Sequence, residues 1–215
     1  ESQGIRRGMW TLTWFMDLLG PEFAAAAAAA GHSREDVLEA EASRVPAGSD
    51  GLMAVLDWLA PGDHPYRKGV LLGFDARQTR GHVYRSIMEA IALTMADKVM
   101  AMRDELGTRI DEVVVSGGGS SSRLFMQIFA DAFGIPASRP VGPSGASLGA
   151  AICAAVAVGL QPDFPTAVAR MEKPRERFQP QAGNVETYRR MNAAVYRDIR
   201  DATDQVLQKS WPLFH

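Results

Sequence analysis

A run of three glycines directly after a β-branched segment constrains this chain more than any other feature. Residues 113–116 read Val-Val-Val-Ser, Gly117, Gly118 and Gly119 follow, and serines at 120–122 open an apolar-periodic segment. This order predicts a strand, a tight turn and a helix N-terminus. Glycines admit a ligand where a Cβ would block it, and a helix N-terminus favours an anion. Two interpretations stay open on this pattern: a phosphate or nucleotide seat, or an ordinary strand-to-helix turn capped by serine.

Hydrophobic periodicity predicts helices that alternate with short strands, which indicates an α/β domain. Ser33 and Thr79 are candidate N-caps, and residues 52–59 stay ambiguous between strand and helix. Residues 171–183 are polar and are interpreted as a connector. Helices are expected over residues 10–19, 22–30, 79–106, 123–133, 145–158, 163–171 and 184–210, with a further one after Ser33, and strands over 69–74, 113–116 and 135–138.

Several well-known catalytic and binding motifs are missing from the sequence. Nothing matches the Gly-x4-Gly-Lys-Ser/Thr phosphate loop, and no Gly-x-Ser-x-Gly nucleophile elbow occurs. The pair Gly117 and Gly119 lacks the third glycine of a dinucleotide fingerprint, because Ser122 stands in that place. The histidines are scattered and no cysteine pair supports zinc, so no metal-ligating residue is predicted.

Composition excludes several kinds of partner. A net charge of -2 gives no electrostatic reason to expect nucleic acid, and no stretch of about 18 apolar residues could span a membrane. The single cysteine, Cys153, excludes an internal disulfide and is expected to be a small buried hydrophobe. The first residues show no secretory signal, so a cytoplasmic location is expected.

Six segments, in order over residues 8–200, resemble the C-terminal half of an FGGY-family carbohydrate kinase, of the xylulokinase- or ribulokinase-like kind. The most specific of them reads Ser-Gly-Gly-Gly-Ser-Ser-Ser, with Gln127 and Asp131 downstream, and resembles the adenosine motif of the family. The resemblance implies a ribonuclease-H-like (actin-like ATPase) α/β domain, a mixed sheet flanked by helices, with additional helices. The segments are residues 8–15, 46–52, 67–74, 79–89, 116–131 and 148–151.

The resemblance also implies an activity and its cofactors. The family uses ATP and Mg²⁺ to phosphorylate a hydroxyl of a small sugar, ketose or polyol, in a cleft between two domains. By this resemblance Gly118 and Ser122 line the adenine-ribose side of the nucleotide. Gly117 and Gly119 shape the turn that lets the nucleotide approach. Family members often dimerise, so a homodimer is expected as a possibility.

Two further residues are placed near the nucleotide by the resemblance, Thr13 and, less securely, Met9. Met9 and Trp10 depart from the family pattern, which has small residues there, and residues 62–65 shorten a family loop. Gly149 is expected to let the helix that contains it pack closely.

The resemblance implies that residues 1–215 form the C-terminal nucleotide-binding domain, without the N-terminal sugar-binding domain. The general base of the family lies upstream of every matched segment, so no catalytic residue is predicted, and Asp50, Asp63 and Asp75 are poor candidates near turns. The fragment is therefore expected to be inactive alone. The alternatives are a non-catalytic nucleotide-binding or regulatory module of the same superfamily, and an unrelated α/β protein whose glycine turn is structural.

Overall fold

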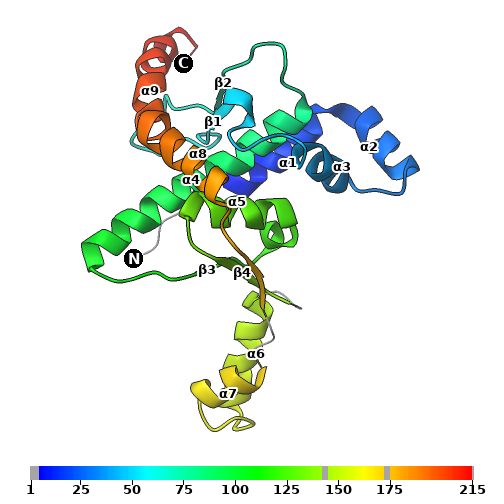
Figure 1. Ribbon diagram of the computed structural model, residues 1–215, viewed down its shortest axis with the longest axis vertical. Coiled ribbons are helices and arrows are strands. Elements are labelled where there is room, and N and C mark those ends of the chain that lie inside the picture. Colours follow the sequence, from blue (N-terminus) through cyan, green and yellow to red (C-terminus); the bar gives the residue numbers. More distant parts are fainter. Residues whose placement is uncertain (1–4, 142–144, 172–174, 215) are drawn as a thin grey trace.

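A single long helix, α4 (Arg80–Leu106), runs through the middle of the molecule (Figure 1). The protein is described by a computed structural model that covers residues 5–141, 145–171 and 175–214. The helix begins after Thr79, whose N–H donates to His82 Nδ1 at 3.1 Å, and ends at Gly107 in the left-handed conformation. Ile87 and Met88, on neighbouring faces, are 0% and 1% exposed, so the helix is buried on more than one side.

Three helices precede α4 in the chain: α1 (Gly8–Leu18), α2 (Gly20–Ala29) and α3 (Arg34–Ala42). The break between α1 and α2 falls at Leu19, one residue before the predicted break at residues 20–21. Gly20 adopts φ +80°, and proline suits the first turn of a helix. Helices α1 and α3 both contact α4, as does α5 (Arg123–Phe133). The apolar core therefore lies around the first half of α4.

The N-terminus of α3 is closed by a reciprocal pair of hydrogen bonds. Ser33 Oγ accepts from the Asp36 N–H at 3.0 Å, and Asp36 Oδ2 accepts from the Ser33 N–H at 3.0 Å. We expect Ser33→Ala to lower the free energy of unfolding by about 1 kcal/mol, the usual cost of a lost N-cap, measured by urea denaturation. Ser43→Ala at the other end of α3 is the control, and an equal loss there would contradict the capping role.

The strands form two small sheets. Strands β1 (Met53–Val55) and β2 (Val70–Leu72) pair antiparallel, so the ambiguous segment at 52–59 contains a strand. Strand β3 (Val113–Val114) pairs in parallel with β4 (Ala137–Pro140), which pairs antiparallel with β5 (Arg175–Phe178). The second sheet is mixed, as expected. The prediction of a connector over 171–183 is wrong, because β5 lies within it and buries Phe178.

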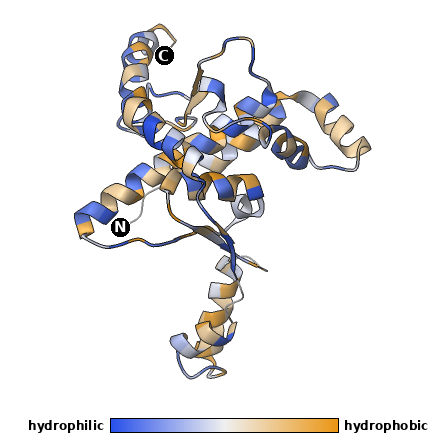
Figure 2. Ribbon diagram, in the orientation of Figure 1, coloured by the Kyte–Doolittle hydropathy of each residue, from blue (hydrophilic) through white to orange (hydrophobic). Residues whose placement is uncertain are grey.

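Helices α6 (Gly145–Ala157) and α7 (Phe164–Met171) contact each other and project away from the rest of the molecule (Figure 1). None of the residues of α6 is buried, although much of the hairpin is apolar (Figure 2). Two expectations are therefore wrong. Cys153 is exposed rather than buried, and a Cβ at Gly149 would have no neighbour within 4 Å, so Gly149 permits no close packing within the described residues.

The C-terminal segment expected as one helix over 184–210 is divided. It consists of α8 (Ala182–Met191), a π-helical turn η3 (Asn192–Tyr196), α9 (Ile199–Ser210) and a final 3₁₀ turn η4 (Trp211–Leu213). Paired side chains hold α9 to the loop between β1 and β2. Arg67 Nη2 lies 2.6 Å from Asp204 Oδ2, and Arg200 Nε lies 2.9 Å from Asp57 Oδ2. Because these partners lie far apart in the sequence, no local pattern predicts that the C-terminal helix is divided.

A carboxylate buried in the core joins three elements. Glu89 is 0% exposed and accepts hydrogen bonds from Arg85 Nε at 2.7 Å and Tyr188 Oη at 2.8 Å. It also accepts from Gly48 N at 3.0 Å and Ser49 Oγ at 2.8 Å. Burial, followed by the charge of Glu89, raises the pKa of Tyr188, which keeps its hydroxyl protonated as a donor. The turn before β1, helix α4 and helix α8 are thus fixed together.

No helix in residues 5–141, 145–171 and 175–214 has the length and apolarity that crossing a bilayer requires.

Candidate nucleotide-binding site

The glycine run forms the turn between β3 and α5 that the sequence predicts. Gly117 adopts φ +99° and ψ −174°, a conformation open almost only to glycine, and a short 3₁₀ helix, η2 (Gly118–Ser121), follows. Ser120 Oγ donates to the Gly117 carbonyl at 2.7 Å, and Ser121 Oγ donates to the Gly118 carbonyl at 2.6 Å. The serines therefore fold back on the glycines and stabilise the turn.

The N-terminus of α5 is already satisfied by side chains of this protein. Ser122 Oγ accepts from the Phe125 N–H at 3.0 Å, and Glu39 Oε1 accepts from the Leu124 N–H at 3.0 Å. A carboxylate thus occupies the place where an anion would bind to this helix. The interpretation of the glycine run as a phosphate or nucleotide seat stays a prediction, and this hydrogen bond favours the nucleotide form of it. A nucleotide at the turn would present its base and ribose, rather than a phosphate, to α5.

A cavity of about 640 Å³ lies between the turn and helices α1, α3 and α4. Its floor is apolar, because Tyr84, Met88 and Phe125 line it and are 4%, 1% and 2% exposed. Burial, and secondarily the charges of Glu35 and Glu39, raises the pKa of Tyr84 to about 12. All of the sequence-predicted nucleotide residues except Gly117 line this cavity: Met9, Thr13, Gly118, Gly119 and Ser122.

Gly119 permits a close approach inside this cavity. A Cβ at Gly119 would lie 3.0 Å from the Cε of Met9 and 3.0 Å from Cε1 of Phe125. The Met9 side chain therefore covers the turn at this point. Gly118 is different, because a Cβ there would meet nothing within 4 Å, so its backbone faces open space. A Cβ at Gly117 would likewise meet nothing within 4 Å, so Gly119 is covered while Gly117 and Gly118 are open.

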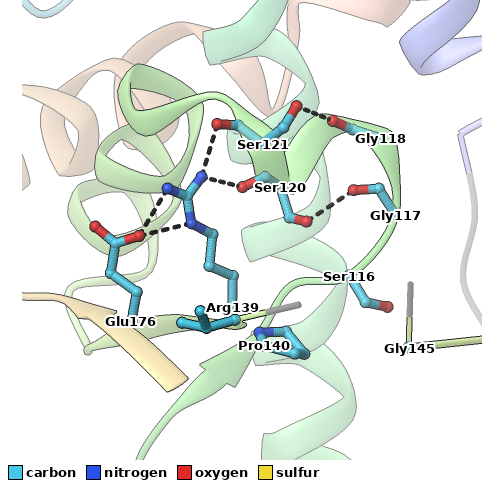
Figure 3. Close-up of a pocket in the computed structure, with 10 residues that line it drawn as sticks. Ser116, Gly117, Gly118, Ser120, Ser121, Arg139, Pro140, Gly145 and Glu176 are labelled. Atoms are coloured by element: carbon cyan, nitrogen blue, oxygen red, sulfur yellow. Dashed lines mark hydrogen bonds and ion pairs between the residues drawn. The ribbon is translucent and has the colours of Figure 1, made fainter. Parts of the chain in front are cut away.

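A second cavity of about 550 Å³ lies on the other side of the turn and includes Gly117 (Figure 3). Arg139, from β4, reaches into it and donates from Nη1 to the carbonyls of Ser120 at 2.5 Å and Ser121 at 2.7 Å. Its Nε donates to Glu176 of β5 at 2.9 Å. Hydrogen bonding to Arg139, more than to Arg123, lowers the pKa of Glu176. The small sheet thus supports the carbonyl side of the turn.

The two cavities share Gly118 and Ser121, so the turn separates them. The lining of the larger cavity includes the carboxylates of Glu35, Asp36 and Glu39, and no Lys or Arg is among the described residues that line it. Such a lining suits the uncharged, hydrogen-bond-donating part of a ligand and repels phosphate.

The three aspartates considered as bases lie elsewhere. Asp75 is paired with Arg77, Asp63 contacts His64, and Asp50 lies 3.1 Å from His82 Nε2; none of them lines either cavity. In the part of the chain that the structure describes, no group of three or more His, Cys, Asp or Glu side chains could hold a metal ion. We therefore assign no Mg²⁺ ligand.

Several residues that line the two cavities were not predicted from the sequence, among them Glu39, Tyr84, Arg139 and Glu176. Glu39 lies 85 residues from Leu124, whose N–H it accepts, so no local pattern links the two. Arg139 and Glu176 meet only because β4 and β5 pair, and β5 was not predicted.

Comparison with known proteins gives consistent matches. Residues 3–158 match the family described as the FGGY family of carbohydrate kinases, C-terminal domain. The uncharacterized sugar kinase YgcE of Escherichia coli strain K12 is 44% identical over 215 residues, which are 100% of this chain and 44% of that protein. Glycerol kinase of Koribacter versatilis is 37% identical over 127 residues, which are 59% of this chain and 25% of that protein.

A solved structure extends the match to the fold. The crystal structure of xylulose kinase from Rhodospirillum rubrum aligns with a TM-score of 0.67 at 31% identity, over 95% of this chain and 38% of that chain. This chain therefore spans less than half the length of these relatives.

Proposed function

Because this chain belongs to the FGGY family of carbohydrate kinases, as a C-terminal domain, we propose that it is the ATP-binding half of a sugar kinase. The enzyme transfers the γ-phosphoryl group of ATP to a hydroxyl of a small sugar, ketose or polyol. The sugar is bound mainly by a region that corresponds to the part of the longer relatives outside these 215 residues. Mg²⁺ accompanies the nucleotide phosphates and neutralises charge during the transfer.

One observation carries the proposal: Gly118, Ser122 and Thr13, predicted from separate parts of the sequence, line the same cavity. The cavity has an apolar floor for a flat base, and the bare backbone of Gly118 faces the open space. Gly117 fits the proposal in another way, because its φ of +99° makes the turn possible. Met9 covers Gly119 and belongs to the wall that the base would contact.

Three further features bear on the location and the partners of the protein. The exposed thiol of Cys153 suits a reducing compartment such as the cytoplasm. The apolar, unburied surface of α6 and α7 suits an interface, either with the rest of the protein or in a homodimer. A net charge of -2 does not favour a nucleic-acid partner.

The proposal is tested by isothermal titration calorimetry of the 215-residue chain with ADP and Mg²⁺. We expect saturable binding with a dissociation constant below about 1 mM, which corresponds to about −4 kcal/mol. Circular dichroism establishes that the sample is folded. A folded sample that releases no binding heat at millimolar ADP would contradict the proposal.

A further inference from the structure

Glu39 holds an unusual position at the proposed nucleotide pocket. It lies on α3, yet its Oε1 accepts the Leu124 N–H at 3.0 Å, at the N-terminus of α5. Its other oxygen, Oε2, accepts no hydrogen bond from the described residues. One oxygen of the carboxylate is therefore fixed by the fold, and the second is available to a ligand.

Two observations place this carboxylate beside the floor of the pocket. Leu124, which it contacts, is followed by Phe125, and Phe125 forms part of that floor. Tyr84, another floor residue, has its pKa raised by burial and in part by the charge of Glu39. Glu39, which is half-buried where Glu35 and Asp36 are exposed, thus lies next to the apolar floor of the pocket.

The orientation of a nucleotide in this pocket follows from charge. The lining includes the exposed Glu35 and Asp36 in addition to Glu39, and the lining residues that the structure describes include no Lys or Arg. A phosphate chain is repelled by these carboxylates and stays toward solvent, whereas the flat base is favoured on the apolar floor. The edge of the base is then the part of the ligand that reaches Glu39.

We propose that Glu39 is a specificity-determining residue of this pocket, whose free carboxylate oxygen accepts a hydrogen bond from the exocyclic amino group of adenine. This inference rests on the proposed function of the site. A carboxylate accepts hydrogen bonds and donates none, so it repels the carbonyl oxygen that hypoxanthine and guanine carry at the same position. A site that pairs with a ligand donor discriminates strongly against an analogue that lacks it.

The test compares ADP with inosine diphosphate by calorimetry in the 215-residue chain. These ligands differ in the base only, so phosphate and Mg²⁺ contributions cancel. We expect the unaltered chain to bind ADP at least about tenfold more tightly than inosine diphosphate. Glu39→Gln keeps an oxygen for the Leu124 N–H and adds a donor for the carbonyl of hypoxanthine. In this variant we expect the preference to fall below about threefold.

Glu41→Gln is the matched control, because this substitution removes the same charge from the same helix. Glu41 pairs with Arg80 and does not line the pocket. It should keep the full preference for ADP. If the unaltered chain binds both nucleotides equally, or if Glu39→Gln keeps the preference, the role of Glu39 is wrong while the proposed function stands. If neither nucleotide binds the folded chain, both are wrong.

Discussion

Replacing Gly118 with valine should abolish detectable nucleotide binding while leaving the protein folded. The Cβ of a residue at 118 meets no atom within 4 Å, so the branched side chain enters the empty space that the nucleotide would fill. The φ angle of Gly118 is not positive, in contrast to Gly117, so a side chain causes no backbone strain. We expect ADP affinity to fall at least tenfold, about 1.4 kcal/mol or more.

Calorimetry measures this loss, and thermal unfolding shows whether the fold survives. Gly118→Ala should give an intermediate affinity, because one methyl fills less of the space. Gly62→Val is the control, since Gly62 also has nothing within 4 Å and lies outside both cavities. Unchanged ADP affinity in Gly118→Val, in a folded sample, would reject the placement of the nucleotide against this turn.

Replacing Glu89 with alanine should destabilise the protein more than any other single change considered. The carboxylate is fully buried, and its removal leaves Arg85, which is 5% exposed, without its counter-charge. It also leaves the Gly48 N–H and the hydroxyls of Ser49 and Tyr188 without the acceptor they use. Breaking a buried pair in this way costs about 3–5 kcal/mol of the free energy of unfolding.

Urea denaturation followed by circular dichroism measures this cost. Glu89→Gln keeps the shape and one acceptor, so its loss should be smaller than that of the alanine variant. Glu186→Ala is the control, because Glu186 is paired with Arg189 on the surface, where ion pairs contribute less than about 1 kcal/mol. A loss below about 1 kcal/mol in Glu89→Ala would show that the network does not stabilise the fold.

The sequence predicted those parts of the fold that depend on neighbouring residues. Ser33 and Ser122 are N-caps, and α5 ends at residue 133 as predicted, where Gly134 adopts the left-handed conformation. Each of these signals lies within one turn of the helix end that it specifies. The strand–turn–helix around the glycine run was predictable for the same reason.

Features set by distant residues were not predictable. In strand β5 the exposed Arg175 and Arg177 alternate with Glu176 and Phe178. This charged sequence has little strand propensity, so the strand forms only because it pairs with β4. The hydrogen bond from the Leu124 N–H to the carboxylate of Glu39 was not predictable, because folding alone brings α3 to the N-terminus of α5. The grouping of Met9 and Thr13 with the turn came from family resemblance rather than from any local pattern.

The turn that separates the two cavities has a consequence for redesign. Gly118 and Ser121 line both cavities, so a ligand long enough to occupy both cavities would pass over these two residues. Arg139 fixes the backbone of the turn through the carbonyls of Ser120 and Ser121. The space for a ligand between the two cavities therefore depends on the side-chain volume at residue 118. A redesign that changes the length of ligand that fits here would therefore begin with residue 118 and leave the other lining residues of both cavities unchanged.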